Sequence, residues 1–547
     1  MSVVRDCPSD RPSTPPKEVL AVAIGFFLIG LLIQYWRLHS LSATYDQALF
    51  LQELWSTARG RFFESSLSSV LSAAVRFQGE PPRVDYLHLG QHANLLSLSG
   101  APLVALLGAW ALPLIQITLL TLAGLVLWRM ASARLRPDLA TQLTVAYYLS
   151  GLVIGPALEN FHDLCWLPLL GFLVVEALLS QRWRQLLICA VLMLLVREDA
   201  GLTLFPLGLW ALLRRPGSRL MGIVLMGLAF LYVAMMTGLI QPQVDSSLSD
   251  RFLQEKFGHL ADDVSGGTFS VLWSILTHPI KLVQALVSPP GETLGFLLAV
   301  TLPLAFIPFL SVDVLLMVLI PLLIALLSQG RTALAVTLRY VLALVPGLFM
   351  GTMLWWQQHP GWWSLRWFRR FWTGCIGLGL VITLASNPHR SLSALVPDSF
   401  QPRVHVSPAA MLKRSQVARA ARAMIPPDAS LAADTPLLPL LADREVAIRF
   451  PRNVEYLDRD GELQSVDWVL AFPGYYEPFV PLFKRETAQR QSIIKRLRAL
   501  TGDGRYRVVS CVDGLVVLRR VEQASTSSDQ GSVSSPLDEH RQSCQPL

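Results

Sequence analysis

Charged residues are scarce in this chain. Of its 547 residues only 16% are charged, whereas 52% are apolar, and the mean hydropathy is +0.45. A soluble globular domain carries about 25% charged residues, so a cytosolic enzyme and a disordered protein are both excluded. The charges are about twice as dense after residue 388 as before it. The composition therefore indicates a membrane body followed by a water-soluble domain.

Cysteine is also rare, and no two cysteines have the close spacing of a metal site. The six lie far apart, at Cys7, Cys165, Cys189, Cys375, Cys511 and Cys544. This pattern favours neither a zinc site nor a disulfide framework. The net charge of +7 comes without a basic stripe interleaved with aromatic residues, so no binding to nucleic acid is expected. No internal repeat is evident.

Long apolar runs dominate the first 387 residues. A helix needs about 20 residues to cross the hydrocarbon core of a bilayer, and eleven stretches reach or approach that length. They lie near residues 18–37, 109–129, 141–158, 164–180, 185–198, 200–213, 219–240, 293–310, 312–328, 333–356 and 371–386. Residues 93–108 favour a further helix that lies on or dips into the outer leaflet. The predicted fold class is mainly α: a polytopic transmembrane helical bundle of about eleven spans, residues 18–387.

Basic residues set the predicted orientation, because cytoplasmic loops are rich in Lys and Arg. Arginines occur in alternate connections, at Arg129, Arg134 and Arg136, at Arg182 and Arg184, at Arg214, Arg215 and Arg219, and at Arg366, Arg369 and Arg370. This alternation predicts a multi-pass protein of the plasma (inner) membrane, with residues 1–17 in the cytoplasm and 38–92 as an outer loop. Six tryptophans predict an interfacial aromatic belt: Trp355, Trp356, Trp362, Trp363, Trp367 and Trp372.

Residues 388–521 predict a C-terminal extracytoplasmic α/β domain, because helices alternate there with strand-like runs. Helices are expected at 411–424 and 486–500, and strands at 430–433, 446–450, 468–472, 506–509 and 515–518. Asp513-Gly514 predicts the turn of a closing hairpin. The polar tail, residues 522–547, is predicted to be disordered.

Four clusters of ionisable residues interrupt the apolar sequence at the predicted outer face. Ionisable groups at membrane depth are costly and are functional candidates by default. The clusters are Asp46 in TYDQALF, with Gln52 in the same predicted helix; His88 and His92 in HLGQH; Glu159, His162 and Asp163 in ENFHD; and Arg197, Glu198 and Asp199 in REDAG. Their placement at one depth predicts a shared site.

Structural roles compete with this interpretation. Asp46 is a favoured residue type for capping the helix predicted at 47–59, which does not exclude catalysis. The REDAG charges are equally consistent with an ion-paired turn. The spacing of His88 and His92 fits one metal-binding helix face, but Gly90 between them weakens that helix, and local hydrogen bonding is the alternative. His162 alone favours a structural role, whereas its acidic neighbours favour a site.

At these clusters the sequence resembles a known family. YDQALFLQELWSTARGRFFESSL is similar to a family pattern of an Asp, a Gln-Ala-Leu-Trp-like helix and an Arg-Gly turn, and NFHD and REDAG are similar to two later motifs. Over most of residues 40–385, and into IPPDASLAAD, the chain resembles a bacterial and archaeal family of multi-spanning membrane proteins of unknown function, grouped with GT-C-type glycosyltransferases. Two positions depart from the pattern: Gln91 stands where the family often has Asp, and Asp163 replaces a Pro.

The resemblance implies an enzyme that transfers a sugar from a polyprenyl-phosphate-linked donor to an envelope acceptor (a glycan, lipid or protein) at the outer membrane face. In such enzymes an acidic residue just after span one is the catalytic base, and Asp46 occupies that place. A positioned carboxylate can take the proton of the attacking hydroxyl. The phosphate leaving group needs cations, for which Arg197, Arg339 and His92 are the candidates.

Two further questions stay open at the level of sequence. Asp46, Glu159, His162 and Asp163 offer ligands that suit Mg²⁺ or Mn²⁺, although their spacing alone does not establish a metal cofactor. The alternative function is a transporter or flippase of a lipid-linked or anionic solute, because intramembrane charges and interrupted helices also mark transport pathways. The lack of an inverted repeat and the large outer segments favour the transferase. A non-catalytic scaffold would leave the polar clusters without a purpose.

Overall fold

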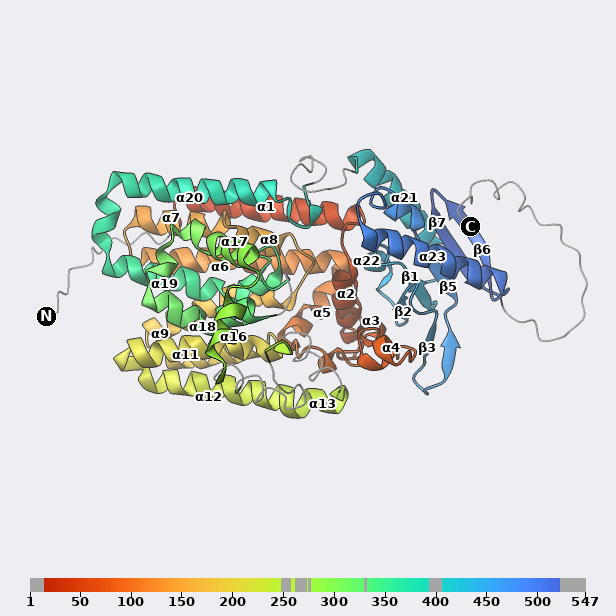
Figure 1. The fold of residues 1–547 in the computed structure, drawn as a ribbon, viewed down its shortest axis with the longest axis horizontal. Coiled ribbons are helices and arrows are strands. Elements are labelled where there is room, and N and C mark those ends of the chain that lie inside the picture. Colours follow the sequence, from red (N-terminus) through yellow and green to blue (C-terminus); the bar gives the residue numbers. More distant parts are fainter. Residues whose placement is uncertain are drawn as a thin grey trace, which may run out of the picture. The chain divides into compact units, whose positions relative to one another are not determined.

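The computed structural model describes residues 14–246, 257–260, 273, 277–328, 332–392 and 406–521. Nearly all of the predicted cytoplasmic segment 1–17 and the whole predicted tail 522–547 lie outside these residues. The chain divides into two compact units (Figure 1). The first, here called the helical unit, contains the described residues up to Leu32, His92–Ser97 and Leu114–His389. The second, the mixed unit, contains Ile33–Gln91, Leu98–Pro113 and the described residues from Arg390 onward.

These units do not coincide with the contiguous domains expected from the sequence. The predicted outer loop 38–92 belongs almost entirely to the mixed unit, together with the C-terminal residues. Val70 of this loop is fully buried in the core of the C-terminal sheet, and Leu457 Nα donates to the Pro82 carbonyl over 2.9 Å. The loop is therefore folded as part of an α/β unit, which a composition boundary at residue 388 does not reveal.

The helical unit is built from apolar helices, which confirms the mainly α prediction. They are α1 Lys17–His39, α6 Ala111–Ser132, α7 Pro137–Tyr148, α8 Gly151–Ala157, α9 Leu167–Leu179, α10 Trp183–Leu194, α11 Gly201–Arg214, α12 Arg219–Met235, α13 Gln241–Val244, α16 Pro279–Leu286, α17 Pro290–Thr301, α18 Val312–Leu327, α19 Val345–Gln358 and α20 Arg366–Ala385. Figure 1 shows α11 and α12 side by side. A Cβ atom on Gly208 would lie 2.8 Å from the Gly222 carbonyl oxygen, so small residues permit this close approach.

Most of the eleven predicted spans contain helices that are shorter than expected. Within the described residues, four helices are long and apolar enough to cross a membrane: Lys17–His39, Leu95–Ser132, Pro216–Val244 and Arg366–Ala385. A pair bent by 66°, Pro279–Leu286 with Pro290–Leu304, raises the number to five if it is one span. The stretch 141–158 is two helices, α7 and α8, because Ser150 caps a new helix by accepting from Leu152 Nα. Likewise, the REDAG turn follows an α10 of only 12 residues.

The helix predicted at 93–108 is a 3₁₀ turn, Leu95–Gly100, followed by α5 Ala101–Leu107. Gly108 has φ +57° and separates α5 from α6. A left-handed φ is readily adopted only by glycine, so the chain bends here even though both flanking segments are apolar.

The mixed unit contains a five-stranded sheet, as the α/β prediction requires. Its helices are α2 Tyr45–Thr57, α3 Ser66–Ser69, α4 Ala73–Phe77, α5 Ala101–Leu107, α21 Pro408–Ala423, α22 Leu438–Leu441 and α23 Lys484–Gly502. Its strands are β1 Leu431–Ala433, β2 Ala447–Arg449, β3 Glu455–Leu457, β4 Leu463–Ser465, β5 Trp468–Ala471, β6 Tyr506–Val512 and β7 Leu515–Arg520. The sheet order is β2-β1-β5-β7-β6. β1 is parallel to β2 and β5, whereas β7 is antiparallel to β5 and β6.

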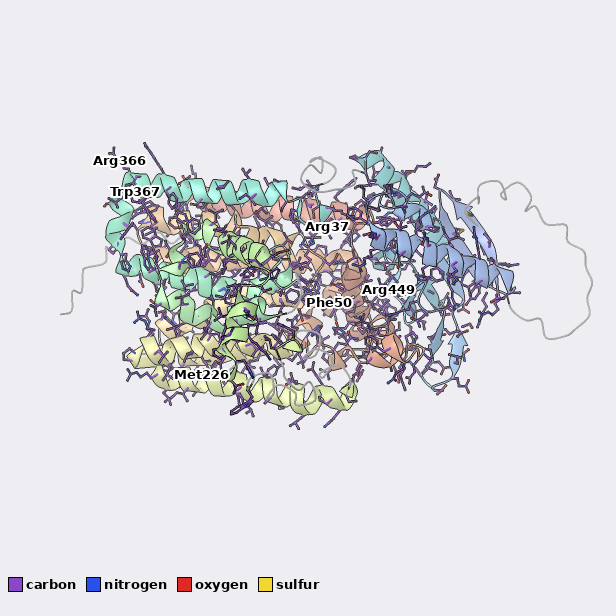
Figure 2. All side chains as sticks on the ribbon, viewed as in Figure 1. Arg37, Phe50, Met226, Arg366, Trp367 and Arg449 are labelled. Atoms are coloured by element: carbon purple, nitrogen blue, oxygen red, sulfur yellow. The ribbon has the colours of Figure 1, made fainter. Side chains whose placement is uncertain are left out.

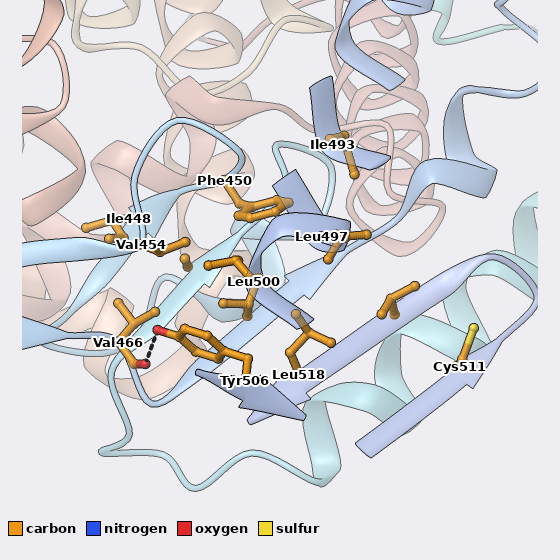
Figure 3. Close-up of a cluster of buried hydrophobic side chains, with 14 of the residues drawn as sticks. Ile448, Phe450, Val454, Val466, Ile493, Leu497, Leu500, Tyr506, Cys511 and Leu518 are labelled. Carbon is orange, nitrogen blue, oxygen red and sulfur yellow. Dashed lines mark hydrogen bonds between the residues drawn. The ribbon is translucent and has the colours of Figure 1, made fainter. Parts of the chain in front are cut away.

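One face of α23 packs on this sheet (Figure 3). Ile493, Leu497 and Leu500 are fully buried in the same cluster as the strand residues, and their i, i+4, i+7 spacing places them on one helix face. Tyr506 closes the cluster by donating from its hydroxyl to the Val466 carbonyl over 2.7 Å. The predicted final hairpin is confirmed, with φ of +49° at Asp513 and +77° at Gly514.

The role expected for the tryptophans needs correction, whereas that expected for the interior cysteines does not. Trp356 and Trp372 are fully buried, and their stacked rings lie with centroids 5.4 Å apart. Most of these tryptophans therefore pack in the core, whereas Trp362 and Trp367 are strongly exposed. The interior cysteines Cys165, Cys189 and Cys375 are buried free thiols, as expected for small apolar residues.

Candidate functional site

Three of the four predicted polar clusters meet in the helical unit. They lie in short connections: His92 precedes the 3₁₀ turn Leu95–Gly100, the ENFHD segment joins α8 to the 3₁₀ turn Asp163–Trp166, and REDAG joins α10 to α11. Helices that stop at these connections leave the polar side chains at helix ends, where they bind one another. We call His92, Glu159, His162, Asp163, Arg197, Glu198, Asp199 and Arg339 the charged cluster.

Glu198, which lies in the REDAG connection, binds the connection that contains His92. Its Oε1 lies 2.8 Å from His92 Nδ1, and its Oε2 accepts from Ala93 Nα over 2.8 Å. Burial would lower the pKa of His92, but the charge of Glu198 and its hydrogen bond raise that pKa overall. His92 therefore holds a proton more tightly than an ordinary imidazole, at a position that is only partly buried.

Arg197 is held by carboxylates on two sides. Its Nε and Nη2 donate to the two oxygens of Asp199 over 2.7 and 2.5 Å, a bidentate pair. Its Nη1 lies 3.7 Å from Asp163 Oδ1. Only 5% of Arg197 is exposed, so these contacts fix the guanidinium in a largely desolvated position.

Asp163 is the most deeply buried acid of the cluster, with no exposed surface. Its Oδ1 contacts His162 Nδ1 and accepts from Leu164 Nα over 2.8 Å. Burial alone would raise the pKa of Asp163, but His162 and Arg197 hold it well below the usual range. Burial, assisted by the charge of Arg339, lowers the pKa of His162 to about 3. At neutral pH the pair is therefore a carboxylate beside a neutral imidazole.

Glu159 binds Arg339 at two points. Its Oε1 accepts from Arg339 Nη1 over 2.6 Å, and its Oε2 accepts from the Arg339 backbone amide over 2.7 Å. Arg339 begins a 3₁₀ turn, Arg339–Ala343, just before α19. A residue 180 positions from Glu159 is thereby fixed within the cluster.

Gln116 of α6 contacts the candidate site and was not predicted from the sequence. It is 1% exposed, and its Oε1 accepts from His162 Nα over 3.0 Å. Its Nε2 donates to the Pro156 carbonyl over 3.0 Å. One amide side chain thus orients the whole ENFHD turn. The signal in the sequence was a single Gln within the apolar run ALPLIQITLL.

The remaining predicted site residues, Asp46, His88 and Gln52, belong to the mixed unit. Thr44, not Asp46, precedes α2 as its N-cap, so the capping role expected for Asp46 is wrong; it lies in the first turn and is partly exposed. His88 is 1% exposed and its Nδ1 contacts Ser68 Oγ at 2.8 Å, which matches the local hydrogen-bonding alternative.

Gln52 has a structural role in the mixed unit. Its Nε2 donates to Ser66 Oγ and to the Arg444 carbonyl over 2.9 and 3.1 Å, and its Oε1 accepts from Ser65 Oγ and Leu67 Nα, each over 2.9 Å. The amide joins α2 to the N-cap and first residues of α3 and to the segment before β2. These contacts occupy both the donor hydrogens and the acceptor oxygen of the amide.

The acids in the part of the chain that the structure describes form no group of three or more metal-ligand residues with suitable geometry. Both oxygens of Glu159 are bound by Arg339. Asp163 Oδ2 is different, because it is buried and has no hydrogen-bond partner among the described residues. A divalent metal cofactor stays a prediction.

A family model described as "Predicted membrane protein (DUF2079)" matches residues 37–517. Among solved structures, the chain is similar to ArnT from Cupriavidus metallidurans, both bound to undecaprenyl phosphate and in the apo state. The identities are 12% and 13%, the TM-score is 0.45 in both cases, and the alignments cover 93% and 92% of this chain and 98% of the other. Such values establish no shared activity. No curated protein matches the chain.

Proposed function

The chain belongs to the DUF2079 family of predicted membrane proteins, and from that premise we propose that it is a GT-C-type membrane glycosyltransferase. It would move a sugar from a polyprenyl-phosphate-linked donor to an envelope acceptor at the outer face of the plasma membrane. The charged cluster is the observation that carries the proposal. Eight ionisable side chains from four separated segments are fixed by one another in an apolar helical unit. Placing ionisable side chains in such surroundings costs free energy, and residues that are kept there despite this cost are functional candidates.

In this proposal Asp46 is the general base. It follows the first membrane-length helix, stands in the first turn of α2 and is partly exposed, so its carboxylate is accessible. As the acceptor hydroxyl attacks the anomeric carbon, its proton passes to a carboxylate oxygen of Asp46. The bond between that carbon and the donor phosphate oxygen breaks, and the lipid phosphate leaves with the electron pair.

Arg197, Arg339 and His92 are proposed to stabilise the leaving phosphate. The carboxylates of Asp199 and Glu159 hold the two guanidiniums in place before a substrate arrives, and such preorganised charge is effective in a desolvated site. The cluster nevertheless contains four carboxylates against these three cations. A divalent cation such as Mg²⁺ or Mn²⁺ would offset this excess of negative charge, but the described residues form no group of three or more metal ligands, and no residue is assigned to hold one.

The experiment replaces Asp46 by Asn in the full-length protein and expresses it in cells that lack the native copy. We expect the lipid-linked sugar donor to accumulate, as measured by mass spectrometry of extracted lipids, because the attacking hydroxyl keeps its proton. Glu80→Gln removes an exposed acid from the same segment and should leave donor levels unchanged. Thermal unfolding of the purified variants confirms that both are folded.

Two outcomes would contradict the proposal. Normal donor levels in a folded Asp46→Asn variant would exclude Asp46 as the base. Unchanged envelope glycans combined with altered uptake of an anionic solute would favour the transporter instead.

A further inference from the structure

A second basic site lies at the start of α20, outside the charged cluster. An open cavity of about 440 Å³ is lined there by Arg366, Arg369, Arg370 and Thr373. Figure 2 shows Arg366 at one end of the helical unit, beside Trp367. The three arginines occupy the first five residues of a 20-residue helix.

No carboxylate neutralises these arginines among the residues that the structure describes. Asp138, which contacts the neighbouring Trp363, is occupied: it accepts from Trp363 Nε1 over 2.7 Å and pairs with Arg136 at 3.3 Å. Arg369 lies over the ring of Trp363, 5.9 Å from its centroid, which orients it without cancelling its charge. The N-terminus of α20 also lacks a side-chain cap, so its first backbone amides add to the attraction for an anion.

The surroundings of the cavity are apolar and exposed. Trp362 is 42% exposed and Trp367 59%, and tryptophan is typical of the boundary between lipid headgroups and hydrocarbon. From this boundary an exposed apolar row continues along α20 through Phe371, Leu378 and Ile382, at spacings that keep it on one side of the helix. α20 is one of the helices long and apolar enough to cross a membrane.

We propose that this cavity binds the headgroup phosphate of an anionic phospholipid, with the acyl chains lying along the apolar row of α20. Free phosphate would use only the arginines and would leave the exposed apolar row uncovered, whereas a phospholipid has both an anionic headgroup for the arginines and acyl chains for the apolar row. Under the orientation predicted from the basic loops, the lipid belongs to the cytoplasmic leaflet. The site is distinct from the charged cluster, and its proposal does not depend on the transferase activity.

Native mass spectrometry of the full-length protein, released from nanodiscs of equal phosphatidylglycerol and phosphatidylcholine, tests the proposal. We expect a retained phosphatidylglycerol on the unaltered protein and at least about a tenfold loss of that adduct in the triple variant Arg366→Gln, Arg369→Gln, Arg370→Gln. The control removes the same charge from other exposed connections, with Arg182→Gln, Arg184→Gln and Arg219→Gln, and should keep the adduct. Trp367→Ala, a milder change at an exposed side chain, should weaken retention without affecting thermal unfolding.

Equal losses in the triple variant and its charge-matched control would overturn the proposal, because they would show a general charge effect. Retention of phosphatidylglycerol by a folded triple variant would overturn it as well. A third arm adds inorganic phosphate to the released protein. If phosphate alone binds and the two lipids are retained equally, the site recognises a free anion and the lipid assignment is wrong.

Discussion

Glu159 holds both the side chain and the backbone of Arg339, with one carboxylate oxygen on Nη1 at 2.6 Å and the other on the amide nitrogen at 2.7 Å. The side chains are 5% and 19% exposed, so the pair is largely desolvated. This contact fixes the segment before α19 to the end of α8 and determines where the guanidinium can act.

Removing Glu159 should therefore destabilise the helical unit strongly. A buried cation that loses its partner costs about 3–5 kcal/mol, so we expect Glu159→Ala to lower the free energy of unfolding by that order, and Glu159→Gln by less because it keeps an acceptor oxygen. Denaturant unfolding in detergent micelles measures the loss. Arg136→Gln, which breaks a pair that is 67% and 43% exposed, should change stability by less than about 1 kcal/mol. Equal effects of Glu159→Ala and this control would show that the pair is not desolvated.

Helices α18 and α19 offer a test of close packing. A Cβ atom on Gly351 would lie 2.7 Å from the backbone nitrogen of Val314, a contact that requires the helices to separate. We expect Gly351→Ala to cost about 1–3 kcal/mol, as overpacking does. Gly377 of α20 has nothing within 4 Å of such an atom, so Gly377→Ala should be neutral or slightly stabilising. Thermal unfolding of the two variants in the same detergent measures the difference, and matched melting curves would refute the close approach.

The elements that local patterns encode were largely predictable from the sequence. The strands β1, β2 and β5 fall within the predicted runs, because buried strands are short apolar segments between turn signals. The hairpin β3–β4 was missed, since its strands are three residues each and are not buried. Helix lengths in the membrane body were overestimated, because hydropathy continues across breaks such as that at Ser150, which is set by capping.

The charged cluster was predictable in membership and in the ion pair within REDAG, Arg197 with Asp199, but not in the pairs between distant segments. His92, Asp163 and Arg197 were identified because charges in apolar sequence are rare, and they do meet. Their partners depend on three-dimensional contacts between distant segments, such as Glu159 with Arg339, and no local pattern encodes those. The role of Gln52 also depends on such contacts. Its motif predicted a functional site, but its hydrogen bonds join α2 to other segments of the mixed unit.

The structural role of Gln52 leads to a further prediction. Gln52→Leu leaves Ser65 Oγ, Leu67 Nα and the Arg444 carbonyl without this partner, and each unsatisfied buried group costs about 1–3 kcal/mol. We expect faster proteolysis of the residue 58–72 segment and a lower melting temperature, with any transferase activity falling only in proportion to the folded fraction. Gln78→Leu, at an exposed position, is the matched control. Loss of activity in a Gln52→Leu protein of normal stability would contradict the structural role and would show that Gln52 acts in the functional site.

Asp434 predicts a pH dependence of the mixed unit. It follows β1 directly, is fully buried, and accepts from Tyr476 Oη and Thr435 Nα through Oδ1, each over 2.8 Å. Burial raises the pKa of Asp434 to about 7, whereas an unfolded Asp has a pKa of about 3.9. Because the folded state binds this proton more tightly, the stabilising contribution is complete below about pH 4 and is lost as the pH rises through about 7.

Asp434→Asn keeps the shape and both accepted hydrogen bonds but never ionises. We therefore expect the unaltered protein to lose protection of β1 and β5 between about pH 5 and pH 8, and the variant to keep it, with a difference on the order of 4 kcal/mol at the upper end. Hydrogen exchange of peptides from these strands, corrected for intrinsic rates, measures the local stability. Asp428→Asn, at an exposed position, should reproduce the unaltered profile. Parallel profiles for Asp434→Asn and the unaltered protein would mean that Asp434 already titrates as an exposed carboxyl, and that its burial does not control the stability of the sheet.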